Sequence, residues 1–136
     1  MKTREEALAY GLSFPYTYKE APFHDQNWEL VRVHGSKKAF LWVYERNGYI
    51  NMNVKVNPEW RDFWRKAYPA VQPGYHQNKE HWSTIVLDGT IPDDTIKDMI
   101  AESYALVCDK PAKRIYEAVK RIPKAVSYTH LTLPTT

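Results

Sequence analysis

Apolar and polar residues alternate along the first half of the chain in a pattern typical of β-strands. The pattern predicts strands over residues 28–33, 38–45 and 49–56, with a turn at Gly35-Ser36 after the first. Asn47-Gly48 separates the second strand from the third, and both residue types accept the positive φ angles of a tight hairpin. The three strands are therefore expected to be neighbours in an antiparallel sheet.

The faces of these strands predict how the sheet is covered. In the third strand Ile50, Met52, Val54 and Val56 alternate with Asn51, Asn53 and Lys55, so one face should be buried and the other polar. The second strand is apolar on both faces. We expect Phe40, Trp42 and Tyr44 on one of its faces and Ala39, Leu41 and Val43 on the other.

A short helix is predicted at the start of the sequence. Thr3 and Glu6 have the spacing of a capping box, and Gly11 is expected to follow the last helical residue near Tyr10. Residues 12–27 contain proline, serine and asparagine and are predicted to form a connector. The connector should pack against the domain, because it also carries aromatic side chains.

Two longer helices follow the predicted strands. Asn57 is a suitable N-cap for a helix over residues 58–67, and an apolar stripe indicates a helix over residues 92–107. The remaining predicted elements are strands over residues 70–72 and 81–87 and a basic helix over residues 111–122. Short turns between consecutive strands imply an antiparallel sheet covered by helices, so the predicted fold class is α+β, a two-layer sandwich. The length of 136 residues fits one domain.

The charge of the chain is unevenly distributed. The formal net charge is +3, but residues 1–109 carry a net −2, residues 110–124 carry +5, and residues 125–136 carry none. A globally basic surface for nucleic acid is therefore not predicted, whereas the segment 110–124 is a candidate for phosphate contacts. Its candidate contacts are Lys110, Lys113, Arg114, Lys120 and Arg121. The alternative is a solvated helix with ordinary surface lysines.

Several classes of protein are disfavoured by the composition. A single cysteine, Cys108, allows no intrachain disulfide and no multi-cysteine metal site. No apolar run has the length of a membrane span, and the first residues lack the apolar core of a signal peptide, so a cytoplasmic protein without membrane contact is expected. Residues 125–136 resemble translated adapter DNA and are expected to be a non-native tail; the alternative is a genuine β-prone tail.

Residues 73–82, PGYHQNKEHW, form the stretch richest in chemically active side chains. His76 and His81 lie five residues apart, a spacing that suits neither a strand face nor a helix face as a metal site, and no third ligand is apparent. An acid–base role for either histidine with Glu80 lacks a nucleophile and an oxyanion stabiliser. A binding surface fits best, because aromatic planes stand beside imidazole, amide and ammonium groups. The alternative is a structural loop.

Three other features are weaker candidates. Lys55 with Arg61, Arg65 and Lys66 could form a positive patch, although Glu59 and Asp62 interleave with them. The aromatic cluster Trp60, Phe63 and Trp64 is expected to belong to the core. Cys108 has no flanking histidine and is a poor candidate for a nucleophile.

The residues resemble a known family. The run from Pro73 to Asp93 has a His-x-Asn-Lys-x-His-Trp core and a downstream Asp-Gly-x-Ile-Pro-Asp, and Met99-Ile100-x-x-Ser103-Tyr104-x-Leu106-Val107 follows it. Together with the Asn57-Pro58-Glu59 step and the Lys38-Ala39-Phe40 strand start, these motifs resemble the MmcQ/YjbR family over residues 1–122.

The resemblance implies a fold similar to that of CyaY and frataxin, described as a double-wing DNA-binding domain. It does not imply an iron carrier, because the two acidic residues of the first helix are offset by Lys2 and Arg4. We therefore expect a small nucleic-acid-binding module, for DNA with low sequence preference, that is a monomer or weak dimer. Its candidate binding residues are Lys55, Tyr75, His76, Asn78, Lys79 and His81. A protein-interaction or small-ligand adaptor is the alternative, and no catalytic residue, metal or cofactor is predicted.

Overall fold

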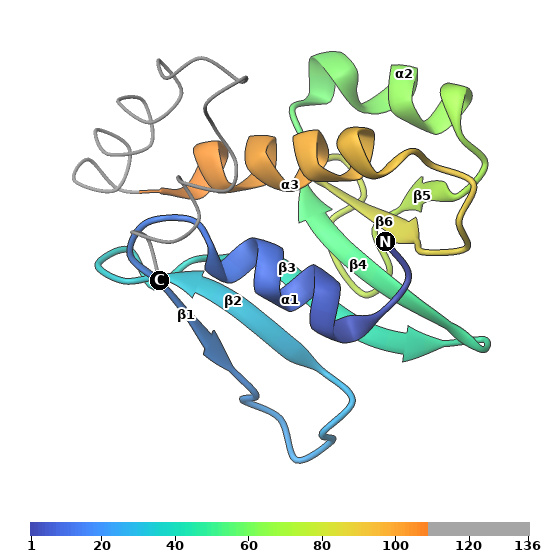
Figure 1. The fold of residues 1–136 in the computed structure, drawn as a ribbon. Coiled ribbons are helices and arrows are strands. Elements are labelled where there is room, and N and C mark those ends of the chain that lie inside the picture. The colour runs from blue at the N-terminus through green and yellow to red at the C-terminus, as the bar shows by residue number, and fades with distance from the viewer. Residues whose placement is uncertain (109–136) are drawn as a thin grey trace, which may run out of the picture.

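A six-stranded antiparallel sheet forms the centre of the structure, a computed structural model that describes residues 1–108 (Figure 1). The strands are ordered β1-β2-β3-β4-β6-β5 across the sheet. In chain order the elements are α1 (Arg4–Leu12), β1 (Thr17–Glu20), β2 (Glu29–Val33), β3 (Ala39–Arg46), β4 (Tyr49–Lys55), α2 (Pro58–Ala67), β5 (Val71–Pro73), β6 (Trp82–Val86) and α3 (Asp93–Val107). The predicted α+β class is confirmed. The helix predicted over residues 111–122 and the tail over residues 125–136 lie outside the described residues.

Helices α1 and α3 cover one face of the sheet (Figure 1). The predicted stripe of α3 is buried there, and its residue Ser103 joins the two layers by hydrogen bonds. The Ser103 hydroxyl donates to the carbonyl of Phe40 at 2.5 Å and accepts from the amide of Lys55 at 2.8 Å. One buried side chain thus satisfies a backbone group on each of β3 and β4.

The first helix extends beyond its predicted end. The capping box of Thr3 and Glu6 is present, but α1 continues through Gly11 to Leu12. A Cβ atom on Gly11 would lie 2.7 Å from Cδ2 of Leu41. Glycine at position 11 therefore allows α1 to pack closely against the sheet. The expectation that Gly11 ends the helix was wrong.

The predicted connector over residues 12–27 contains an edge strand. Strand β1 pairs with β2 in antiparallel register, and two ion pairs tie it there. Lys19 lies 3.2 Å from Glu29, and Nε of Arg32 lies 2.8 Å from Glu20. A strand this short is stabilised by its partner strand more than by its own sequence, so the local pattern did not reveal it.

The pattern of strand β3 is interrupted by a bulge. The register between β2 and β3 shifts between Val31 and Arg32, where β3 has one extra residue. As a result Phe40 faces the helices beside Leu41, with its ring 5.2 Å from that of Tyr104. The expectation that Phe40 shares a face with Trp42 and Tyr44 was wrong, because strict alternation fails at a bulge.

The central part of the sheet face opposite α1 and α3 is covered rather than open to solvent. Asn53 is fully buried on it and Asn51 nearly so. The amide of Asn53 donates at 2.8 Å to the carbonyl of Tyr75 and to Oε1 of Gln77, both in the loop that joins β5 to β6. The polar pattern of β4 was predicted, but its burial was not, because the covering loop comes more than twenty residues later in the chain.

The buried amide of Asn53 predicts a large effect of its removal. Its Oδ1 accepts hydrogen bonds from the hydroxyls of Tyr44 and Thr84, both at 2.7 Å. Asn53→Leu leaves these hydroxyls and the carbonyl of Tyr75 without their partner. We expect it to lower the free energy of unfolding by about 2–4 kcal/mol in urea denaturation. The control is Gln72→Leu on the exposed part of the same face, for which we expect the free energy of unfolding to fall by about 0.5 kcal/mol or less. Equal losses in the two variants would contradict the structural role assigned to the Asn53 side chain.

Candidate functional site

The loop over residues 74–81 is the centre of the candidate site, and its backbone is held internally. Oδ1 of Asn78 accepts hydrogen bonds from the amides of Glu80 at 2.8 Å and His81 at 3.3 Å. The ammonium of Lys79 donates to the carbonyl of Gly74 at 3.2 Å. A Cβ on Gly74 would lie 2.8 Å from the carbonyl oxygen of Trp82, so only glycine allows the two ends of the loop to come this close.

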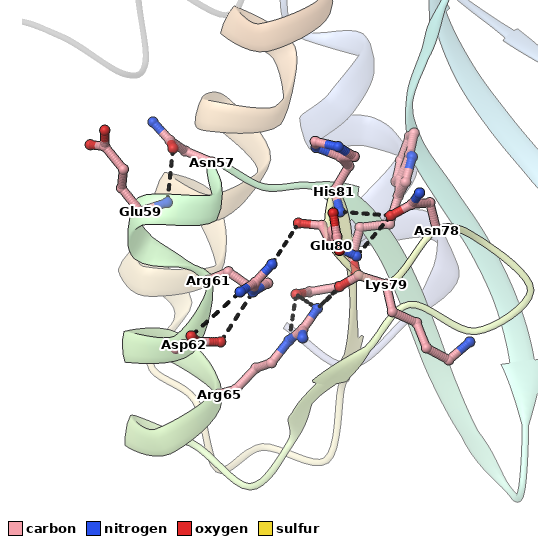
Figure 2. Close-up of polar contacts among 11 residues, drawn as sticks. Asn57, Glu59, Arg61, Asp62, Arg65, Asn78, Lys79, Glu80 and His81 are labelled. Carbon is pink, nitrogen blue, oxygen red and sulfur yellow. Dashed lines mark hydrogen bonds and ion pairs between the residues drawn. The ribbon is translucent and has the colours of Figure 1, made fainter.

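Two arginines of α2 bind the loop from outside (Figure 2). Nη2 of Arg65 donates to the carbonyls of Lys79 at 2.6 Å and Trp82 at 3.0 Å, and it also contacts the hydroxyl of Ser83. Nη1 of Arg61 donates to the carbonyl of Glu80 at 3.3 Å. Partial burial lowers the pKa of Arg65, and a guanidinium remains charged at neutral pH despite such a shift.

These contacts change the interpretation of the positive patch predicted from Lys55, Arg61, Arg65 and Lys66. The guanidinium groups of Arg61 and Arg65 are turned toward backbone carbonyls of the loop, and Arg61 is also paired with Asp62 at 3.1 Å. A continuous basic patch on α2 is therefore not formed. The spacing of four residues, which places both arginines on one helical face, was the signal in the sequence for a shared partner.

An aromatic layer lies between the loop and the sheet. The ring of Tyr75 stacks on that of Tyr44 at 5.9 Å and on Trp28 at 6.3 Å, and the His76 ring lies 3.9 Å from it. The guanidinium of Arg46 lies 3.9 Å from the centre of the Tyr75 ring, within the range of a cation–π contact. Burial raises the pKa of Tyr44, so its hydroxyl stays protonated as a hydrogen-bond donor.

The structure places five of the six predicted binding residues in the loop over residues 74–81 and divides them by role. Tyr75 and Asn78 hold the loop in place, so their polar or aromatic groups are already engaged. His76, Lys79 and His81 are exposed, and Figure 2 shows the Lys79 side chain extending away from α2. Lys55 is the register partner of Trp82 at the end of the loop. The predicted phosphate contacts Lys110, Lys113, Arg114, Lys120 and Arg121 lie outside the described residues.

Helix α2 carries aromatic side chains that the sequence assigned to the core. Trp60 and Phe63 are 53% and 54% exposed, with their rings edge to face at 5.9 Å, and Trp64 is partly buried. The expectation of burial was wrong for the first two. Helix α2 packs mainly against the short strand β5, which is too small to cover an aromatic face of this width.

The described residues, 1–108, contain neither a metal-binding cluster nor a membrane-spanning helix. Within residues 1–108 no three His, Cys, Asp or Glu side chains are placed to hold a metal ion. None of the helices in that range combines the length and apolar character that a membrane span requires.

Comparison with known proteins identifies relatives of this chain. The family model YjbR matches residues 12–106. The chain belongs to the YjbR family. It is 31% identical to YjbR of Escherichia coli K12 over 75% of this chain and 84% of that protein, and 31% identical to YyaQ of Bacillus subtilis over 78% and 98%.

Solved structures support the same assignment. A crystal structure of a Deinococcus radiodurans protein with a DUF419 domain matches the YjbR-family chain with a TM-score of 0.75, 27% identity, and coverage of 96% of this chain and 94% of that one. A Pseudomonas syringae protein matches with a TM-score of 0.69 at 24% identity, covering 77% and 98%, which shows a shared fold. The YjbR and YyaQ relatives are themselves uncharacterised, so family membership establishes the architecture and leaves the activity to be argued from the site.

The contacts of Arg65 with the loop over residues 74–81 generate a testable prediction for this YjbR-family domain. Arg65→Met keeps an apolar stem but removes the donors to Lys79, Trp82 and Ser83. We expect a loss of about 2–3 kcal/mol in stability and, by hydrogen exchange, at least about tenfold faster exchange of amides in residues 75–81. The control is Lys66→Met, an exposed neighbour for which neither change is expected. Unchanged amide exchange rates in residues 75–81 of the Arg65 variant would show that the loop is held without the Arg65 contacts.

Proposed function

We propose that this YjbR-family domain is a nucleic-acid-binding module that contacts DNA with low sequence preference. The observation that carries the proposal is the exposed rim of the loop, which consists of the side chains of His76, Lys79 and His81. His76, Lys79 and His81 project from a backbone that is already fixed by Asn78 and Arg65. A rigid loop loses little conformational entropy on binding, and imidazole and ammonium groups are donors for phosphate oxygens.

The same geometry supports low sequence preference. Reading a base edge requires a fixed group with free hydrogen-bonding capacity, such as a bidentate amide. The carboxamide oxygen of Asn78 already accepts two backbone amides, so it is committed to the loop. Lys79 uses one of its three ammonium donors on the carbonyl of Gly74. Its remaining donors and the two histidines suit contacts to the phosphate backbone more than contacts to particular bases.

The charge distribution sets the expected strength of binding. Residues 1–109 carry a net −2, so the loop by itself offers few phosphate contacts in an overall acidic field. The segment 110–124, with a net +5, is proposed to add phosphate contacts. Binding should therefore be weak and strongly dependent on salt, because each neutralised phosphate contributes about 0.9 to the slope of log K against log salt concentration on B-DNA.

The test is fluorescence anisotropy of a labelled random duplex at several salt concentrations with the full chain. The double variant Lys55→Gln with Lys79→Gln removes two charges and keeps hydrogen-bonding side chains. We expect its salt slope to fall by about 1–2 and its affinity at low salt to fall at least about tenfold.

The matched control for this test neutralises two lysines on the helical side of the domain. Lys97 contacts the Tyr10 ring of α1, and Lys2 lies two residues before Arg4, the first residue of α1, so the double variant Lys2→Gln with Lys97→Gln should bind as the wild type does. Equal losses in the two double variants would mean a diffuse charge effect and contradict a loop site. Absence of binding by the full chain at physiological salt would reject the nucleic-acid function.

A second candidate function, a protein-interaction adaptor, is favoured by the exposed rings of Trp60 and Phe63. We propose that a second copy of this chain binds the exposed face of α2. In a two-fold interface, Trp60 and Phe63 of one copy would pack against the same two rings of the other copy. Two mutually buried aromatic pairs would stabilise a weak dimer.

Sedimentation velocity over a range of concentrations tests this candidate. The wild type should self-associate weakly, with little dependence on salt, and Trp60→Ser with Phe63→Ser should abolish the association. Tyr16→Ser, at another half-exposed aromatic residue outside α2, is the control and should leave it unchanged. A wild type that remains monomeric at all concentrations would reject α2 as a self-association surface.

A further inference from the structure

A cleft lined by both polar and apolar residues lies at the opposite end of strand β4 from Lys55, beside the tight turn that joins β3 to β4. Figure 1 shows the position of this turn. Its volume is about 360 Å³, within the range of small-molecule sites. The residues that matter for its chemistry are Arg46, Tyr49, Asn51, Gln72 and Asp88. None of them belongs to the loop over residues 74–81, so the cleft is a separate feature from the proposed nucleic-acid site.

Asn51 supplies a fixed acceptor in the floor of the cleft. The residue is only 2% exposed, and its Nδ2 donates to the carbonyls of Tyr49 at 2.9 Å and Arg46 at 3.2 Å. These two bonds fix the orientation of the carboxamide. None of the hydrogen bonds made within residues 1–108 uses Oδ1 of Asn51.

That oxygen is not sealed inside the protein. Among the described residues, the fully buried side-chain polar atom that lacks a partner is Nε1 of Trp42, and Oδ1 of Asn51 is not in that state. Since Asn51 lines the cleft and is otherwise buried, its free acceptor opens into the cleft. A ligand that fills the cleft displaces water from this oxygen and leaves it without a donor unless the ligand carries an N–H group, so the site selects for such a group.

Arg46 supplies a positive charge at one side of the cleft. Its guanidinium lies over the face of Tyr75, and no carboxylate in residues 1–108 pairs with it. The stacking on Tyr75 fixes the plane of the guanidinium while leaving its N–H donors available. A guanidinium held in this way is suited to bind a carboxylate or phosphate with two parallel hydrogen bonds.

Asp88 places a negative charge at the other side. Strand β4 lies between β3, which carries Arg46, and β6, after which Asp88 follows, so the two charges flank Asn51 from opposite sides. Hydrogen bonds from the hydroxyl and amide of Thr90 lower the pKa of Asp88, which keeps the carboxylate ionised. The cleft therefore has the Arg46 guanidinium on one side and two hydrogen-bond acceptors, Oδ1 of Asn51 and the Asp88 carboxylate, toward the other side.

We propose that this cleft binds a small organic anion that also carries an N–H donor. The anionic group lies against Arg46, and the N–H group donates to Oδ1 of Asn51 on the side of Asp88. The half-exposed ring of Tyr49 offers a flat wall for a ring or planar amide between these two ends. This chemistry has two common sources, nucleotides with an exocyclic amine and free amino acids, and the experiment distinguishes them.

The test is an NMR titration of the uniformly ¹⁵N-labelled full chain with four probes. CMP has the anion and the exocyclic amine, the 5′-monophosphate of pyrimidin-2-one riboside has neither that amine nor a ring N–H, cytidine lacks the phosphate, and glutamine is an amino acid with both groups. For the nucleotide source we expect CMP to shift the Asn51 side-chain amide at concentrations up to about 5 mM, with the pyrimidin-2-one nucleotide and cytidine each at least about fivefold weaker. For the amino-acid source, glutamine alone should produce these shifts.

Two variants separate the cleft from a general charge effect. Arg46→Gln should weaken CMP or glutamine at least about fivefold and leave cytidine unchanged, whereas Lys97→Gln on α3 should change nothing. Failure of all four probes to shift cleft residues at about 5 mM would overturn the proposal. Equal binding of CMP and the pyrimidin-2-one nucleotide would also overturn it, since Asn51 would then not select an N–H donor. None of these outcomes depends on whether the domain binds DNA.

Discussion

The burial of the Asn53 carboxamide is the constraint on which the rest of this structure depends. A carboxamide in the middle of a sheet face loses its hydration, and only a complete set of partners compensates for that loss. Two hydroxyls satisfy its oxygen, and the loop between β5 and β6 satisfies its nitrogen. The loop is therefore drawn onto the sheet, the aromatic rings pack beneath it, and a face that would otherwise be polar becomes a second buried layer.

Holding the loop in this way decides what it can do. Its carbonyls are satisfied by Arg65 and Arg61, and its turn amides by Asn78. The groups used for these contacts are unavailable to a partner, so the exposed rim retains only a few imidazole and ammonium groups. Such a surface favours general contacts with phosphate over base-specific readout. The cleft beside the turn between β3 and β4 differs, because there the Asn51 acceptor and the Arg46 guanidinium have no polar partner within residues 1–108.

The sequence by itself determined the elements whose signals lie within a few residues. The Asn57-Pro58 start of α2, the Asn47-Gly48 turn with both φ angles positive, and the capping box of α1 are all where the pattern predicts them. Five of the six strands match the predicted ranges to within one residue at each end. Caps, turns and periodicity are local effects of backbone geometry, so a short stretch of sequence contains all the information that they require.

The tertiary structure alone decided the contacts of the polar side chains and the burial of those whose local pattern indicated otherwise. The edge strand β1, the bulge at Phe40 and the close approach at Gly11 each depend on a partner distant in the chain. The exposure of the aromatic face of α2 and the burial of Asn51 and Asn53 reverse what the local pattern indicates. Burial depends on which segment lies across the face, and residue types at neighbouring positions do not encode that choice.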